Sequence, residues 1–283
     1  MNLEAFFDAI TRNSSSGVVV NADSANSLAS VFAAISFISR QVASYELTCP
    51  NAAVEYLLTV SPDDIMTAND FKLAAMQNLL QYGNAFARIH FGNDGWPEKL
   101  EFIASHRVSV NITPDHVLKN YWVDGKAELP SKLIHWKIHS LDGLIGRSPI
   151  HVCRDAIGLG IAQQNQAANQ QANGLRPSGV IETELFLNSE NGKKFKASLN
   201  ERLPGETLVL EGGAQWKATS QSNADAEFTA SRAFSVVEVA RIFGLGKIWL
   251  NADEGGARYD NLGAEQRSLL LNTIGPYLNS CSE

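Results

Sequence analysis

Apolar positions in the first third of the chain recur with the 3.6-residue period of helices. This pattern predicts helices over about residues 24–45 and 53–59, and a third that starts after Thr67. Asp70, three residues after Thr67, makes a variant of the capping box with Asp in place of Glu. Gly83 supplies the stop signal of the third helix. The chain therefore begins, in our interpretation, with a helical layer.

The hydrophobic period changes to two between residues 84 and 138, and this period is typical of strands. Five short alternating segments predict strands, over residues 84–91, 98–104, 107–112, 121–125 and 133–138. Turn signals lie at Asn93-Asp94-Gly95 and at Asp124-Gly125. Helices followed by an antiparallel sheet predict an α+β fold for residues 1–140.

A polar helix is the most informative feature of the second half. Ser148 and Pro149 favour a helix start, and Gly174 favours its end, so a helix of about 37 Å is expected over residues 149–173. Every residue of 162–173 is Ala, Gln or Asn, so this part has neither an apolar face nor charged i,i+4 pairs. Either it stands in solvent on Ala propensity, which is marginal, or it packs between helices with its amides bonding across the contact.

A companion for the polar helix follows a compact insertion. Residues 178–219 predict a strand, a short helix and a hairpin that turns at Gly212-Gly213. A second long helix over residues 222–244 then returns, so the two long helices form a hairpin with a small domain at its tip. Copies arranged side by side around a closed ring would cover each other, and the amide surface could line a channel with few strong binding partners for a polyanion.

The last part of the sequence predicts a Gly-rich polar loop over residues 251–263 and a helix over 264–271. Asp253, Glu254 and Asp260 cluster in this loop, but their spacing does not match a calcium-binding loop. A solvated loop is the simpler interpretation.

Composition narrows the class of protein. The chain has 283 residues, a length that fits one large domain or two smaller ones. Hydrophobic residues make up 45% of it, enough for a sizeable core, and charged residues make up 19%. Its formal net charge of −7 argues against tight duplex binding, which needs Lys and Arg on phosphates, but not against DNA passing nearby. No apolar run approaches the ~20 residues of a membrane span. Three widely spaced cysteines and an N-terminus unlike a signal peptide predict a soluble intracellular protein with reduced thiols.

Enzyme motifs are weak throughout. The sequence has no GxSxG, HExxH or GxxxxGK[ST] motif, and Gly244-Leu245-Gly246-Lys247 is only a faint phosphate loop after a helix. His135 and His139 would lie about 13 Å apart on one strand face, too far to share a metal. His151 and Cys153 lack a third ligand. We therefore expect no metal and no cofactor, and the rival hypothesis is a nucleotide- or metal-binding hydrolase that uses the 247–260 region, with Lys247, Asp253 and Glu254.

The insertion is locally basic. Its cationic side chains are Lys193, Lys194, Lys196 and Arg202. They predict either a solvated helix face or a docking surface for an acidic partner.

Five stretches, taken in order, carry a resemblance to a known family. They are LLQYGNAFARI (79–89), IHWKIHSLDGLIGRSPI (134–150), ANGLRPSGVI (172–181), DAEFTASRAFSVVEVARIFGL (225–245) and, more weakly, ARYDNLGAEQRSLLLNTIGPYL (257–278). Together they span most of the chain, and they resemble the HK97-like family of portal proteins from tailed bacteriophages.

The resemblance implies a division into parts. Residues 1–147 would form the wing domain, a layer of helices with an antiparallel sheet. Residues 148–177 would form the first stem helix, 178–219 a small α/β clip at the tip of the hairpin, and 220–246 the second stem helix. Residues 247–263 would form the tunnel loop, and 264–283 the start of a C-terminal wing helix, with the crown absent.

The resemblance also implies a function without catalysis. The chain would form a ring of about twelve copies at one capsid vertex, through which double-stranded DNA passes without sequence specificity. Terminase large subunit, a head–tail adaptor and the major capsid protein would be its partners. It would reside in the virion, and in the host cytoplasm during assembly. A third hypothesis is a monomeric binding module whose polar helix is an exposed linker.

Candidate site residues follow from these assignments. For the channel and tunnel loop they are Asn251, Asp253, Glu254, Arg258, Tyr259 and Asn261. For stem contacts with a neighbouring copy or the channel they are Gln163, Gln166, Gln170 and Arg232. For docking of a partner on the clip they are Lys193, Lys194, Lys196 and Arg202.

Overall fold

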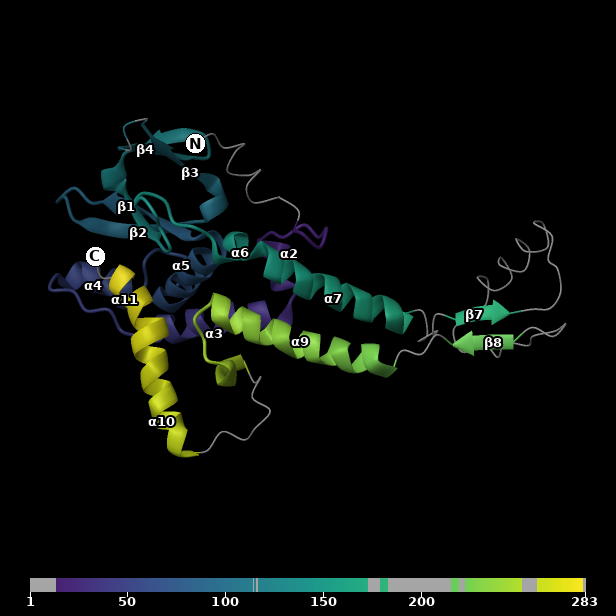
Figure 1. Cartoon of the computed structure of the whole chain (residues 1–283). Helices are drawn as coiled ribbons and strands as arrows, with labels where there is room; N and C mark the ends of the chain where they lie inside the picture. Colours follow the sequence, from purple (N-terminus) through teal and green to yellow (C-terminus); the bar gives the residue numbers. More distant parts are fainter. Residues whose placement is uncertain are drawn as a thin grey trace. The chain divides into compact units, whose positions relative to one another are not determined.

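A computed structural model describes residues 14–113, 115, 117–172, 179–182, 215–218, 222–250 and 259–281. The chain divides into two compact units, residues 1–161 with 233–283 and residues 162–232. In the described part, no helix has the length and apolar character that crossing a bilayer requires. The helices and strands are labelled in Figure 1.

The first unit begins with a helical layer, as predicted. Its helices are α2 (Ala22–Asn26), α3 (Ala29–Ala43), α4 (Ala52–Thr59) and α5 (Ala68–Tyr82). The Thr67 side chain accepts a hydrogen bond from the Asp70 amide, and Gly83 ends α5 in the left-handed region at φ 78°. The expected single helix over 24–45 is wrong, because the chain leaves helical geometry at Leu28, which has φ −82° and ψ 114° and is buried.

Two small antiparallel sheets follow the helices (Figure 1). The first has the order β2-β1-β6, with β1 at Asn84–Phe91, β2 at Pro97–Ile103 and β6 at Leu133–Lys137. The second has the order β3-β4-β5, with β3 at Val108–Ile112, β4 at Leu118–Val123 and β5 at Lys126–Glu128. Short 3₁₀ turns, η1 (Ser105–Arg107) and η2 (Pro130–Lys132), connect the strands. The expected mixture of helices and antiparallel sheet is confirmed.

The hairpin between β4 and β5 was not predicted as a strand pair. Asp124 and Gly125 form its turn with φ values of 48° and 78°. Two consecutive positive φ values are the signature of the tight turn that Asp-Gly favours. The turn signal was therefore right, and only the three-residue strand after it was missed.

The long helices differ from the prediction at one end. The helix expected over 149–173 is two helices, α6 (Pro149–Val152) and α7 (Arg154–Ala172), because Cys153 leaves helical geometry at φ −103° and ψ 25°. The companion helix α9 (Ser222–Ile242) matches its prediction within two residues. In the second unit, β7 (Gly179–Glu182) pairs antiparallel with β8 (Gln215–Ala218). The predicted turn at Gly212-Gly213 lies outside the described residues.

The C-terminal segment is more helical than expected. It contains the 3₁₀ turn η3 (Lys247–Leu250), α10 (Tyr259–Ser268), the π-helical turn η4 (Leu269–Ile274) and α11 (Gly275–Cys281). The predicted loop over 251–263 is therefore wrong for residues 259–263, which are the first half of α10. Asn261 and Gly263 favour loops only weakly, and the helix formers after Gly263 outweigh them.

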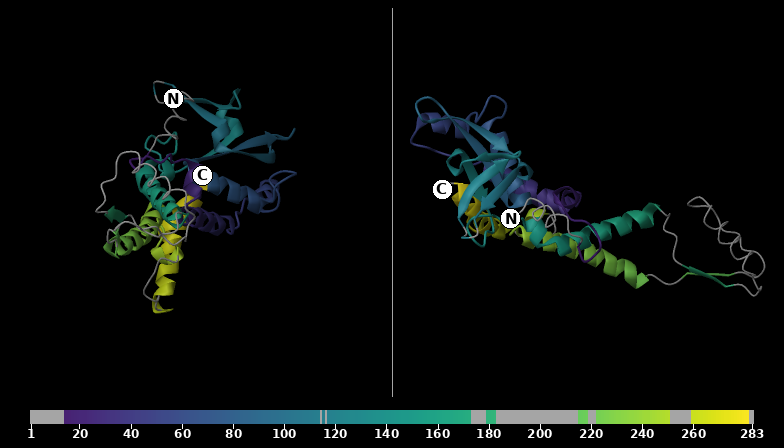
Figure 2. Two further views of the ribbon diagram at one scale, coloured as in Figure 1. Left: turned by 90° about the vertical axis from the view of Figure 1, so that its right-hand side faces the viewer. Right: turned by 90° about the horizontal axis from the view of Figure 1, so that it is seen from above.

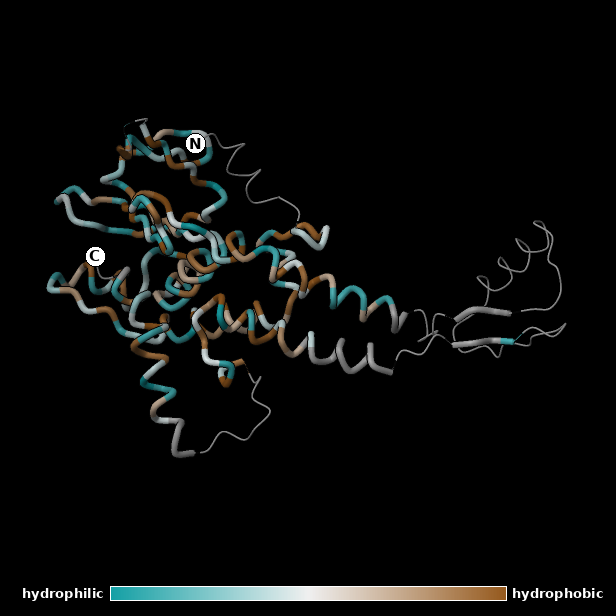
Figure 3. The backbone as a smooth tube through the Cα atoms, viewed as in Figure 1, coloured by the Kyte–Doolittle hydropathy of each residue, from teal (hydrophilic) through white to brown (hydrophobic). Residues whose placement is uncertain are grey.

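One core in the first unit brings together the beginning, middle and end of the chain. It contains Ile35 and Ile38 of α3, Ile157 and Ile161 of α7, Phe243 after α9 and Tyr277 of α11. Figure 3 shows apolar residues along these segments and the change to polar residues along α7. The first two turns of α7 are thus fixed by burial, and the rest of that helix is not.

Candidate functional site

Two glycines allow close contacts at the start of α7. A Cβ atom on Gly160 would lie 2.7 Å from Ser235 Oγ of α9 and 3.1 Å from Leu28 Cδ2. A Cβ atom on Gly158 would lie 2.3 Å from Ser14 Oγ. Figures 1 and 2 show that α7 and α9 run antiparallel here, side by side. The two long helices therefore approach each other closely where α7 carries no side chain.

Within the second unit an amide of α7 bonds to α9. Gln163 Nε2 donates a hydrogen bond of 2.5 Å to Ser231 Oγ. This supports the expectation that the polar residues bond across the contact, although the partner lies in the same chain. Gln163 Oε1 is buried and has no hydrogen-bond partner among the described residues. A buried acceptor without a donor is unfavourable by about 1–3 kcal/mol, so this amide is only partly satisfied by the contact between α7 and α9.

The other predicted stem residues are placed less completely. Gln166 and Ala168 are exposed, and Ala167 is half-buried. Gln170 and Arg232 belong to α7 and α9, but their side chains lie outside the described part. Exposed amide and methyl groups on one helix leave a surface that has no charge.

The predicted tunnel-loop and clip residues lie mostly outside the described residues. Asn251, Asp253, Glu254 and Arg258 fall there, as do Lys193, Lys194, Lys196 and Arg202 of the clip. Tyr259 and Asn261 lie in α10 instead, so their placement in a loop is corrected.

The faint phosphate loop has another explanation. Gly244 follows α9 with φ 65°, its amide bonds to Arg241 O at 3.2 Å, and the Leu245 amide bonds to Ala240 O at 2.8 Å. These two bonds and the left-handed glycine form a Schellman cap, which ends a helix. Lys247 then begins η3. The segment therefore has the geometry of a helix stop and not of a phosphate loop.

A buried network that the sequence did not reveal joins the first and second family-like stretches. Asn84 Oδ1 accepts a hydrogen bond from the Gly146 amide at 2.7 Å, and Asn84 Nδ2 donates to Gly146 O at 3.0 Å. The Asn84 side chain thus pairs with the backbone of Gly146 as a second peptide group would. The backbones touch as well, because Gly83 O accepts from the Ile138 amide at 2.9 Å.

His135 completes this network as a neutral side chain. Its Nε2 lies 2.9 Å from Asn84 Oδ1, an acceptor, so Nε2 carries the hydrogen and Nδ1 accepts from Tyr121 OH at 3.1 Å. The ring stacks on Phe86 with centroids 4.4 Å apart. Burial, with a smaller effect of Lys137, lowers the pKa of His135 to about 3. Both ring nitrogens of His135 are thus hydrogen-bonded within the protein, and the side chain has a structural role.

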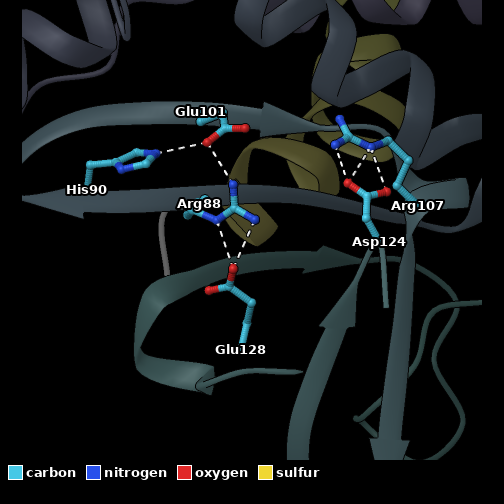
Figure 4. Close-up of polar contacts among 6 residues, drawn as sticks. All are labelled: Arg88, His90, Glu101, Arg107, Asp124 and Glu128. Carbon is cyan, nitrogen blue, oxygen red and sulfur yellow. Dashed lines mark hydrogen bonds and ion pairs between the residues drawn. The ribbon is translucent and has the colours of Figure 1, made fainter. Parts of the chain in front are cut away.

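Ion pairs link strands of the first sheet to each other and to β5 of the second sheet (Figure 4). Arg88 of β1 contacts Glu101 of β2 at 2.8 Å and Glu128 of β5 at 2.9 Å, and Glu101 also contacts His90 at 2.9 Å. Burial alone would raise the pKa of Glu101, but the hydrogen bonds from His90 and Arg88 outweigh burial and lower it. Arg107 pairs with Asp124 beside the β4–β5 turn. The Arg88 pairs hold strands together, and the Arg107–Asp124 pair joins η1 to the β4–β5 turn.

No metal site is evident in the part of the chain that the structure describes. There, no three His, Cys, Asp or Glu side chains gather closely enough to hold an ion. Cys153, beside His151, is half-buried, and burial and then the nearby Glu238 raise its thiol pKa. A thiol with a raised pKa is a poor metal ligand and a poor nucleophile.

Comparison with known proteins identifies relatives. A family model described as phage portal protein matches residues 29–283. The portal protein of Enterobacteria phage HK97 is 30% identical over 232 residues, which are 79% of this chain and 54% of that protein. The chain thus spans about half the length of this curated relative.

Two solved structures share the fold. The HK97-family phage portal protein from Corynebacterium diphtheriae has a TM-score of 0.69 at 16% identity, covering 91% of this chain and 86% of that one. A chain in the neck of a native gene transfer agent particle, computed with C12 symmetry, has a TM-score of 0.65 at 24% identity, covering 89% and 74%. At these identities the likeness establishes the fold alone.

Proposed function

The chain belongs to the phage portal protein family, and we propose that it assembles into a ring at one capsid vertex, with a central channel for double-stranded DNA. The ring contains about twelve copies, in keeping with the C12 symmetry of the gene transfer agent neck. DNA passes in both directions, for packaging and for ejection, without sequence specificity.

The observation that carries this proposal is the exposed, uncharged surface of α7. From Ala156 to Ala172 the helix has no charged residue, and beyond Ile161 it has no apolar side chain larger than Ala. Gln166 and Ala168 in this stretch are exposed, so its uncharged amide and methyl groups are uncovered in the single chain. A polar helix of this kind is stabilised best between other helices. Identical copies around an axis provide such neighbours for every subunit at once.

An uncharged channel wall also suits the passage of DNA. Binding of a protein to duplex DNA rests on Lys and Arg that neutralise phosphates and release counterions. Ala, Gln and Asn provide no such charges, so DNA can slide past them without being held. The net charge of −7 acts in the same direction.

The parts of the chain take family roles in this proposal. Residues 1–147 form the wing, residues 148–177 and 220–246 the stem, and 178–219 the clip, where terminase large subunit and later a head–tail adaptor dock. The segment between η3 and α10 is the tunnel loop. The wing contacts the major capsid protein. The chain resides in the virion, after assembly in the host cytoplasm, and makes or breaks no bond. The helix-stop geometry of Gly244 leaves the rival hydrolase without its phosphate loop.

The ring is tested by mass measurement in solution and by negative-stain microscopy of the purified chain. We expect particles of about twelve copies with an open centre wide enough for duplex DNA. Particles of a single copy, or closed dimers without a central hole, at every concentration and also in the presence of capsid scaffold would contradict the proposal.

A further inference from the structure

An outer face of the α7–α9 pair in the first unit exposes two large apolar side chains. Leu159 of α7 is 51% exposed and Phe234 of α9 is 56% exposed. Their sequence neighbours Gly160 and Ser235 face each other across the helix contact. Successive residues of a helix are rotated by about 100° around its axis. In two antiparallel helices, the residues that precede the two contact positions are therefore rotated toward the same side of the pair. Leu159 and Phe234 thus point to one face.

The core lies on the other side of the same helices. Ile157 and Ile161 of α7 and Val239 of α9 are buried in it. The face of Leu159 and Phe234 is therefore separate from the core and points away from it. Single exposed apolar side chains are common, but two that point to one face of adjacent helices form a candidate contact with another protein.

Phe234 contacts a charged neighbour on its own helix. Arg241 lies with its guanidinium 5.8 Å from the centre of the Phe234 ring, and Glu238 pairs with Arg241. Positions 234, 238 and 241 share one side of a helix. Aromatic and Arg side chains dominate the binding energy of interfaces, and a side chain already held in one conformation loses less entropy when it is buried.

We infer that this face, defined by Leu159, Phe234, Glu238 and Arg241, is covered by a neighbouring copy of the chain, with Phe234 as the anchor of the subunit contact. This inference rests on the ring proposed above and assigns the contact to the base of the two long helices.

Two observations favour a second copy over another partner. The chain carries a net charge of −7, so copies repel each other unless they meet where charge is absent or balanced. Glu238 and Arg241 cancel on this face, and Leu159 lies within the stretch of α7 from Ala156 to Ala172 that carries no charge. Leu159 also belongs to the same helix as the polar residues that the proposed ring would cover.

The test compares Phe234→Asp with the wild-type chain by mass measurement in solution over a range of concentrations. A charge at a buried interface anchor is expected to weaken association by at least about 30-fold, which is the effect of an energetic hot spot. The melting temperature of the single copy should stay within a few degrees, because Phe234 is exposed there. Phe234→Ala, which removes the ring without adding charge, should weaken association in the same direction.

A matched control separates the effect of the face from the effect of charge. Ile65→Asp adds the same charge at a side chain that is 88% exposed on the loop before α5, and rings should form normally. If both Phe234 variants form rings at wild-type concentrations, the assignment of this face is overturned. If the wild-type chain itself forms no ring, the proposed function fails, and this inference fails with it.

Discussion

Replacing Gly146 with alanine is expected to lower the stability of the first unit by about 4 kcal/mol or more, a large share of the roughly 5–15 kcal/mol that holds a domain folded. The new Cβ atom would lie 1.9 Å from the carbonyl oxygen of Gly83 and 2.9 Å from the Ile138 amide nitrogen. Both are backbone atoms that cannot turn away as a side chain could.

Relief of this clash would break the surrounding bonds. Gly83 O accepts from the Ile138 amide, and Asn84 pairs with both backbone groups of Gly146. Displacing either strand end would leave these buried groups without partners, at about 1–3 kcal/mol for each. The clash and the lost bonds therefore act on the same point, where α5, β1, β6 and the segment before α6 meet.

Gly263→Ala is the matched control, and it is expected to raise the stability of the protein instead of lowering it. Gly263 lies inside α10 and no atom approaches its Cβ position within 4 Å. Alanine is favoured over glycine in a helix by about 1 kcal/mol, so this variant should be slightly more stable. Urea unfolding followed by circular dichroism measures both. A Gly146→Ala chain that unfolds at the same urea concentration as the wild type would show that the contact is looser than described.

The double substitution of Ala167 and Ala168 by leucine is expected to block ring closure while the single copy still folds. Ala167 is half-buried and Ala168 exposed within one chain, so the added methylene groups meet little there. In a ring they would enter contacts built from small side chains, where overpacking costs about 1–3 kcal/mol at each site. The cost repeats at every subunit contact around the ring.

The fraction of closed rings, counted by negative-stain microscopy, measures this effect. Circular dichroism checks that the helices remain folded. Ala127→Leu on β5 adds the same side chain at an exposed position away from both long helices and should leave rings intact. Closed rings of normal diameter from the double variant would show that these alanines do not lie in a subunit contact.

Local signals in the sequence were sufficient for much of the fold. Thr67, Gly83 and the Asp124-Gly125 turn each fix a backbone conformation through their own chemistry, so the structure confirms them. The contact between the stretches around Gly83 and Gly146 could not be predicted from the sequence. They contact each other through glycine backbones and one asparagine, 62 residues apart in the chain.

Other features depended on contacts between distant residues. The helix break at Cys153 is not marked in the sequence by a Gly or Pro at that position. The first half of α10 contains Asn261 and Gly263, which are typical of turns, so the sequence favoured a loop there. The bond from Gln163 to Ser231 joins two helices separated by the whole insertion. Phe234 gave no signal in the sequence, and its 56% exposure shows that it faces away from the core.

Amide hydrogen exchange along residues 162–172 tests most directly whether identical copies shelter the polar helix. The account predicts that these amides exchange at least about tenfold more slowly in the assembled ring than in the single-copy fraction separated by size exclusion, because an isolated polar helix opens readily. Equal exchange rates in the two fractions would contradict it, since the helix would then be stable without its neighbours.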